Sequence, residues 1–125
     1  MEKIVQEMLH QIIESKSYDE KQIEVYFSPQ YIQVVNTTVL DFEGFKKHIQ
    51  KLKAVVDSIN LEILHTGVGD HCVFTNHRVH VVLKDQSSHY YKVMAMFVFE
   101  ENKIIRCEEL TYLVEGEGDN LGAVV

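Results

Sequence analysis

The sequence predicts an α+β fold in which three N-terminal helices pack in the concave face of a curved, mainly antiparallel sheet. Apolar residues recur at helical spacing before residue 58 and alternate with polar residues after it. The alternating segments then follow one another with only short turns between them, which is typical of an antiparallel meander. Such a sheet curls around the helices, and we expect a ligand pocket between the helices and its concave face.

The first half of the chain predicts three helices and one strand. The first helix is amphipathic, with an apolar stripe formed by Ile4, Val5, Met8, Leu9, Ile12 and Ile13. Ser17 and Glu20 form a capping box that starts a second, short helix, and we expect Pro29 to end it. Residues 31–40 are rich in β-branched and aromatic types and predict a strand. Asp41 is the expected N-cap of the third helix.

The second half predicts a meander of long strands, roughly at residues 59–67, 71–83, 89–99 and 103–114. Gly67, Gly69 and Asp70 mark the first turn, and residues 85–88 mark the second. The third turn, residues 100–102, suits a three-residue hairpin with its last residue, an asparagine, in the left-handed conformation. The tail from about residue 116 is rich in glycine and shows no period.

Length and composition predict one domain over residues 1–125 with a substantial core, because 46% of the residues are hydrophobic. The net charge of -7 argues against a nucleic-acid partner, which would require a basic patch. No stretch approaches the ~20 apolar residues of a membrane helix, so we expect no membrane partner. The N-terminus lacks a signal-peptide pattern. Cys72 and Cys107 lie in predicted strands, so we expect free thiols and a reducing, cytoplasmic location.

The last predicted strand carries the strongest candidate for a functional residue. Alternation places Ile105, Cys107, Glu109, Thr111 and Leu113 on one face, with a single carboxylate among mainly apolar neighbours. An ionised carboxylate without a partner is costly in such surroundings. Glu109 therefore has a partner, keeps its proton or has a chemical role. In the structural alternative, Glu109 pairs with Arg78 or with a tyrosine hydroxyl group.

Strand pairing predicts which side chains surround this carboxylate. A three-residue third turn would place Glu109 opposite Val93, Cys107 opposite Ala95 and Thr111 opposite Tyr91. Apolar neighbours would raise the pKa of Glu109 toward the range of a general acid or base.

Enolisation beside a carbonyl also requires a hydrogen-bond donor to the enolate oxygen. Tyr31, Asn36 and Tyr91 are the candidate donors, and Cys107 and Thr111 are expected to line the same pocket. A four-residue second turn would direct His80 toward Val93 as a further polar group, although a solvent-facing histidine is the alternative.

Other chemistries find little support in the sequence. His77 and His80 point to opposite faces of one strand, and His71 lies too far from His77 to share a metal ion, so we expect no metal. No phosphate-binding, dinucleotide-binding or nucleophile motif is present, so we expect no cofactor. Cys107 shares its face with a carboxylate and not with a cation, which predicts an unreactive, protonated thiol.

The opposite face of the sheet predicts an interface. Large apolar side chains gather there beside the charged Lys92: Met94, Met96, Val98, Leu110 and Tyr112. A surface of this kind is normally covered. We expect a homodimer through the outer face of the sheet, although the same face could dock another protein.

Two stretches carry a family resemblance, FSPQYIQVVNTTVLDFEGFKKHIQKL and FVFEENKIIRCEELT. The first, with its tyrosine–x–glutamine step and capped helix, and the second, a closing hairpin, resemble the SnoaL-like branch of the nuclear transport factor 2-like cone fold.

The resemblance implies a cone-shaped fold and, in the cyclases of this branch, an acid/base group on the last strand, at or beside Glu109. The branch usually has Asp there and His two positions earlier, where this sequence has Glu109 and Cys107. From the resemblance and the candidate carboxylate together, we expect a small apolar or carbonyl-containing ligand and a cofactor-free isomerase, cyclase or dehydratase. The alternative is a non-catalytic ligand-binding or protein-interaction module of the same fold.

Overall fold

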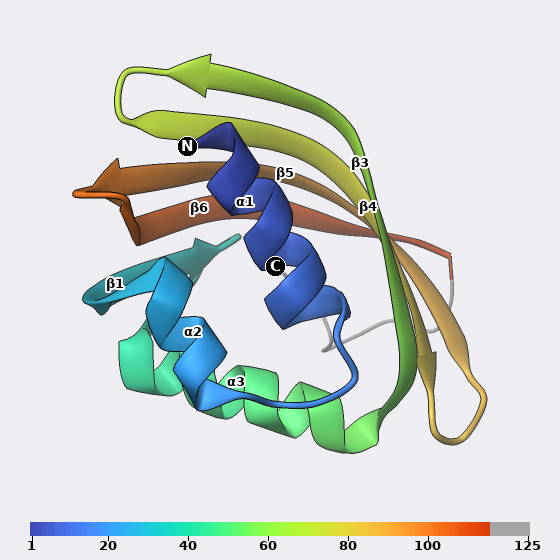
Figure 1. Cartoon of the computed structure of the whole chain (residues 1–125). Helices are drawn as coiled ribbons and strands as arrows, with labels where there is room; N and C mark the ends of the chain where they lie inside the picture. Colours follow the sequence, from blue (N-terminus) through green and yellow to red (C-terminus); the bar gives the residue numbers. More distant parts are fainter. Residues whose placement is uncertain (116–125) are drawn as a thin grey trace.

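The computed structural model describes residues 1–115, and the predicted Gly-rich tail lies outside the described residues. Its helical elements are α1 (Glu2–Met8), η1 (Leu9–Glu14), α2 (Glu20–Tyr26) and α3 (Phe42–Val55). Its strands are β1 (Phe27–Val35), β2 (Thr38–Asp41), β3 (Val56–Gly69), β4 (Cys72–Leu83), β5 (Ser88–Glu100) and β6 (Lys103–Glu115). The helices lie in the hollow of one curved sheet (Figure 1), which confirms the predicted α+β architecture.

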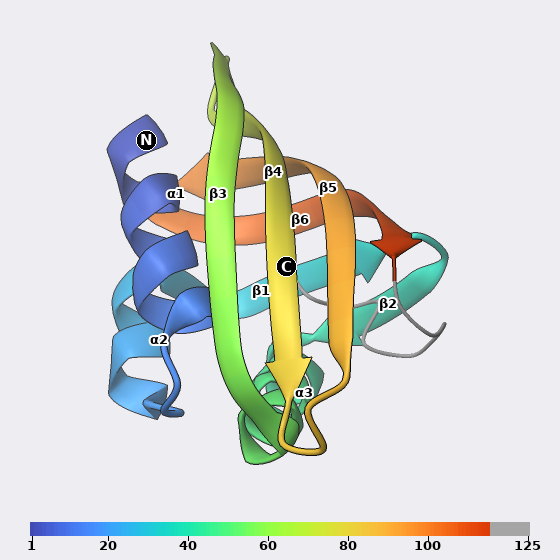
Figure 2. The same ribbon diagram turned by 90° about the vertical axis from the view of Figure 1, so that its right-hand side faces the viewer.

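The sheet has the strand order β2-β1-β6-β5-β4-β3. Strand β1 runs parallel to β6, and every other neighbouring pair among the described strands is antiparallel. The long strands bend strongly, so that the sheet wraps around the helices (Figures 1 and 2). The inner face therefore becomes the wall of a cone, and the outer face remains exposed.

The helices differ in detail from those predicted. The first helix continues as a π-helical segment, η1, and its last turn is tied to α3 by Lys53, whose ammonium group donates to the carbonyl of Ile13 at 2.5 Å. The second helix is capped by Asp19 and not by Ser17, because the Asp19 carboxylate accepts from the backbone N–H groups of the first turn. It ends at Tyr26, before the predicted stop. Asp41 caps α3 as predicted, accepting from the Gly44 N–H at 2.8 Å.

One expected strand proves to be two, because the chain turns back at Asn36. Its φ of 54° is a left-handed conformation that asparagine tolerates. Strands β1 and β2 then pair as a short antiparallel hairpin, from Ile32–Asp41 to Val35–Thr38. The second half of the chain forms the predicted meander, in which β3, β5 and β6 are longer than expected and β4 is one residue shorter.

The β5–β6 turn has two residues, Glu101 and Asn102, and not three. Both adopt positive φ values, 50° and 65°, and Glu100 pairs with Lys103. A bulge at Ile105 follows, because Phe99 pairs with Ile104 whereas Val98 pairs with Arg106. The predicted pairing of this hairpin was therefore wrong by two residues, a shift that leaves each side chain on its predicted face.

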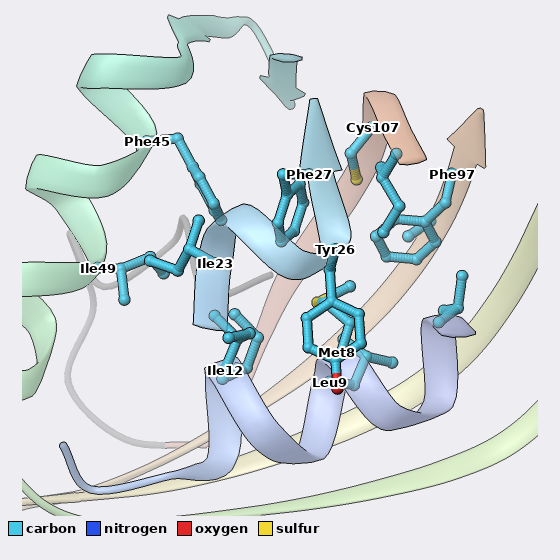
Figure 3. Close-up of a cluster of buried hydrophobic side chains, with 14 of the residues drawn as sticks. Met8, Leu9, Ile12, Ile23, Tyr26, Phe27, Phe45, Ile49, Phe97 and Cys107 are labelled. Carbon is cyan, nitrogen blue, oxygen red and sulfur yellow. The ribbon is translucent and has the colours of Figure 1, made fainter. Parts of the chain in front are cut away.

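The core lies between the helices and the inner face of the sheet, and Figure 3 shows part of it. The rings of Phe27, Tyr31 and Phe45 contact one another, with centroids 4.6 to 4.9 Å apart. Full burial of each large apolar side chain contributes about 1.5–3 kcal/mol. This packing holds α3 against β1, and β1 pairs with β6, whose inner face carries Glu109.

Candidate functional site

A group of buried polar side chains crosses the inner face of the sheet, which is otherwise mainly apolar. Its members come from β1, β4 and β6 and are at most 3% exposed: Tyr31, Gln33, Thr75, His77 and Glu109. We call this group the inner polar band. Strand register brings its members onto one surface, because Glu109 pairs with Ala95, which in turn pairs with Thr75. The curvature of the sheet then tilts these side chains toward one another.

Glu109 is buried with an incompletely bonded carboxyl group. Its Oε2 accepts a hydrogen bond from Thr111 Oγ1 at 3.4 Å, while Oε1 has no hydrogen-bond partner among the described residues. Burial raises the pKa of Glu109 well above its ordinary value, and the Thr111 hydrogen bond offsets only part of this. The group therefore holds its proton at pH values where an exposed glutamate is ionised.

Arg78 and Tyr31, two partners open to Glu109 in the structural alternative, both bond other residues. The guanidinium of Arg78 instead contacts Glu62 at 2.6 Å, and both side chains are exposed. The Tyr31 hydroxyl group donates to Gln33 Oε1 at 2.8 Å. The alternative in which Arg78 pairs with Glu109 is therefore wrong.

Tyr31 and Gln33 form a buried hydrogen-bonded pair on β1. Because the Tyr31 hydroxyl group occupies the carbonyl oxygen of the Gln33 amide, the amide nitrogen Nε2 is oriented away from it, and Nε2 has no partner in the described part of the chain. Burial, followed by the nearby Cys107 and Glu109, raises the pKa of Tyr31 well above its ordinary value. Tyr31 therefore remains a hydrogen-bond donor throughout the neutral range.

Cys107 sits between this pair and Glu109. It is in register with Gln33 on one side and Phe97 on the other. Burial, and secondarily the carboxyl group of Glu109, raises the pKa of the Cys107 thiol well above its ordinary value. The thiol is free, and its protonated state makes it a poor nucleophile.

His80 does not take its expected position. It pairs with Tyr90 and not with Val93, stacks on the Tyr90 ring at a centroid distance of 4.0 Å, and places Nε2 2.7 Å from Ser88 Oγ. The pairing differs from the predicted one by three residues, and an odd shift reverses the face of every side chain. His77 therefore occupies the inner face instead, with Nδ1 2.9 Å from Thr75 Oγ1.

The other candidates divide between the site and its surroundings. Thr111 pairs with Val93 and contacts Glu109. Tyr91 is buried on the inner face, yet it pairs with Leu113, further along β6. Asn36 is exposed at the β1–β2 turn, where its side chain bonds both backbone groups of Thr111. It joins the ends of two strands and lies outside the inner polar band.

Gln33 and His77 were not among the predicted site residues. The signal for Gln33 was present, because it is the one amide that alternates inward with Tyr31 and Val35 in an otherwise apolar stretch. No comparable local signal existed for His77. Its placement depends on the length of the β4–β5 turn.

The surface hollow that includes Glu109 lies on the outer side of the sheet. It has a volume of about 310 Å³ and is lined by the outward-facing side chains of Met94, Met96 and Leu110. The inward-facing residues Thr75, Ala95 and Glu109 also border it. On the inner face, Phe97 and Phe99 are buried in the core. The described residues contain no group of histidine, cysteine or carboxylate side chains able to hold a metal ion. None of the described helices is long and apolar enough to cross a membrane.

Comparisons with known proteins identify the fold. No family model matches the chain. An uncharacterised protein of Schizosaccharomyces pombe is 25% identical over 100 residues, which are 80% of this chain and 77% of that protein. The structure of AclR, a putative hydroxylase from Streptomyces galilaeus, superposes with a TM-score of 0.76 at 11% identity, covering 90% of this chain and 79% of AclR. IdmH, a putative polyketide cyclase from Streptomyces antibioticus, gives 0.74 at 10% identity, covering 88% and 90%.

Proposed function

Because the chain has the cone fold of SnoaL-like, nuclear transport factor 2-like proteins, we propose that its inner face binds a small apolar or carbonyl-containing molecule. Glu109 would act on this molecule as an acid/base group, without a cofactor. The observation that carries the proposal is the buried carboxyl group with one unbonded oxygen. AclR and IdmH share the fold only, so their printed activities support a class of site and not a reaction.

The chemistry follows from the state of the carboxyl group. A carboxylic acid that stays neutral near neutral pH can protonate a substrate oxygen. Once ionised, it is an unusually strong base, because its apolar surroundings disfavour the charge. Removing a proton beside a carbonyl and returning one elsewhere is the shared step of isomerisation, cyclisation and dehydration.

Deuterium exchange tests this proposal with simple carbonyl compounds in place of the natural substrate. These compounds, starting with 2-cyclohexen-1-one, are incubated with the protein in deuterium oxide, and loss of the hydrogens beside the carbonyl is followed by NMR. The wild type should accelerate exchange, and Glu109→Gln should lower that acceleration by about 100-fold or more. The control is Glu108→Gln, because Glu108 is exposed and pairs with Arg106.

Equal acceleration by wild type and Glu109→Gln would refute the role of Glu109. A wild type that does not accelerate exchange would favour the alternative function, a non-catalytic ligand-binding or protein-interaction module. One observation keeps that alternative in view. Glu109 and Gln33 both present unbonded polar atoms, and these could hold a ligand without transforming it. If the protein then binds the same compounds without exchanging their hydrogens, it is a binding module.

We also propose that the protein forms a homodimer through the outer face of the sheet. Four large side chains there are 47–70% exposed and form an outer apolar patch: Phe74, Met94, Leu110 and Tyr112. Met94 pairs with Leu110, and the hollow of about 310 Å³ lies across these strands. A continuous exposed surface of this kind is typical of an interface.

Sedimentation analysis tests the dimer. Leu110→Glu should convert the dimer to a monomer, because it places a carboxylate in the middle of the outer apolar patch. Val25→Glu is the matched control, since Val25 is 55% exposed on α2, away from this face. A monomeric wild type, or a dimeric Leu110→Glu variant, would refute the proposal.

The free thiols of Cys72 and Cys107 support a reducing, cytoplasmic location.

A further inference from the structure

Two buried polar atoms of opposite character share the inner face without partners. Gln33 Nε2 is a hydrogen-bond donor and Glu109 Oε1 belongs to a carboxyl group, and neither is bonded to any described residue. The two side chains are 0% and 3% exposed. Leaving such an atom unbonded inside a protein costs about 1–3 kcal/mol. A pair of them on one surface therefore calls for an explanation beyond packing.

The register shows that the two side chains are neighbours. On the paired strands β1 and β6, Gln33 is in register with Cys107, and Val35 is in register with Glu109. Gln33 and Glu109 are thus one step apart on adjacent strands and face the same side. An amide donor and a carboxyl oxygen so placed would bond each other if they came within reach. Both nevertheless remain unbonded, so a ligand atom that reaches both would satisfy both.

The surroundings hold the two groups in place and set a small apolar residue beside Glu109. The Tyr31 hydroxyl group fixes the Gln33 amide by occupying its carbonyl oxygen at 2.8 Å, and Thr111 holds the other oxygen of Glu109. On the far side of Glu109, the inward side chain in register is that of Ala95, a single methyl group. The next inward residues on either side of Ala95 are Val93 and Phe97, which are apolar.

Charge restricts what the bridging atom can be. The buried lysines of the described chain are engaged elsewhere, since Lys46 pairs with Glu43 at 2.9 Å and Lys53 bonds the end of η1. A phosphate, sulfonate or carboxylate would therefore meet no lysine beside Glu109 and would incur a large cost of losing its hydration. A neutral oxygen on an apolar frame meets a donor, a proton-carrying acid and apolar walls.

We propose that Gln33 Nε2 and the Glu109 carboxyl group together bind a single neutral oxygen atom of the ligand. The ligand is a small ketone, enol or alcohol. The Gln33 amide donates one hydrogen bond to this oxygen, and Glu109 donates the second. If the oxygen is that of a carbonyl, Glu109 passes its proton to this oxygen, and the carboxylate so formed takes a proton from the neighbouring carbon, which gives the enol and re-forms the acid. The Gln33 amide stabilises the oxygen during this transfer. This assignment rests on the proposed function for the location of the site, and it adds the binding partner of Glu109 and the class of ligand.

A matched set of ring compounds tests the assignment by NMR titration at millimolar concentrations. The probes are 2-cyclohexen-1-one, 2-cyclohexen-1-ol and cyclohexene, which differ in the oxygen only. The ketone and the alcohol should shift the side-chain amide resonances of Gln33, and cyclohexene should not. Gln33→Met keeps the length of the side chain and should weaken ketone binding by about tenfold, while leaving cyclohexene binding unchanged. Gln30→Met is the control, because Gln30 is exposed on the same strand.

Each outcome separates this inference from the proposed function. Gln33 resonances that stay unchanged with all three probes, or ketone affinity that Gln33→Met leaves intact, overturn the inference even if Glu109-dependent exchange is observed. Gln33-dependent ketone binding without any exchange supports the inference and refutes catalysis. Because the resonance test uses the wild type, it stands even if Gln33→Met fails to fold. Tyr31→Phe, which frees the amide to rotate, should weaken ketone binding by a smaller factor.

Discussion

The folded protein should lose stability with rising pH because of one side chain, Glu109. Burial raises the pKa of this carboxyl group well above its ordinary value of 4.5. Between pH 4.5 and the native pKa, the native state therefore holds a proton that the unfolded chain has released. Since the native state binds more protons in this window, the free energy of unfolding falls as the pH rises. It is highest below pH 4.5 and reaches its lower plateau above the native pKa.

The size of the effect follows from linkage. One group that is protonated in the native state and ionised in the unfolded state gives a slope of about 1.4 kcal/mol per pH unit. Between pH 5 and pH 7 the loss attributable to Glu109 is thus up to about 3 kcal/mol. For a domain of this length, that corresponds to a fall in Tm of about 10 °C. Glu109→Gln, which is neutral at every pH, should lack this component.

The assay compares urea unfolding of wild type and Glu109→Gln at several pH values from 5 to 7. Contributions from all other side chains are common to both proteins. The difference in free energy of unfolding between the two proteins therefore isolates Glu109. A difference that is independent of pH would show that the carboxyl group titrates normally, and a difference of opposite sign would place a cation beside it. Either result would remove the basis for acid/base chemistry at this residue.

Three further predictions concern the scaffold. Asp41→Ala should lower the free energy of unfolding by about 1 kcal/mol in urea unfolding, because it removes the cap of α3. Burial lowers the pKa of Lys53 from 10.5 to about 8, so the native state releases this proton at a lower pH than the unfolded state does. Wild-type stability should therefore rise from pH 8 to 10.5 relative to Lys53→Met, measured by parallel urea unfolding; parallel pH profiles would contradict this. Replacing Glu101 and Asn102 by Asn-Gly should raise Tm, with a gain of about 1 kcal/mol, because both positions have positive φ.

The fold was predictable because its signal is distributed over many residues. The change from helical to alternating periodicity near residue 58 separates the helices from the meander, and an error at any single position does not alter it. The boundaries were less accurate where one side chain decides them. Asp19 and Ser17 are both good caps, and only the path of the backbone selects Asp19.

The sequence predicts a site residue correctly only where the error in strand register is an even number of residues, because an even shift keeps each side chain on its face of the sheet. The β5–β6 turn is shorter than predicted and is followed by a bulge, which shifts the pairing by two residues and keeps Glu109 on the inner face. The β4–β5 pairing is displaced by three, which exchanges His80 for His77. Loop residues such as Gln86, which has a φ of 72°, set these lengths through local geometry that the hydrophobic pattern does not record.

The inner polar band should lower the free energy of unfolding of the free protein, and a double variant tests this. Tyr31→Phe combined with Gln33→Met removes a buried hydrogen-bonded pair and also removes the unbonded Nε2 group. Replacing both members of a buried pair by apolar groups of similar shape is neutral or stabilising, and losing an unbonded donor adds about 1 kcal/mol, or a rise in Tm of about 4 °C. Gln33→Met alone should be less stable than the double variant, because it leaves the Tyr31 hydroxyl group without its acceptor. Should the double variant instead unfold more easily than wild type by over about 1 kcal/mol, Gln33 Nε2 must be bonded in the free protein. The amide would then be structural, and it would not be available to a ligand.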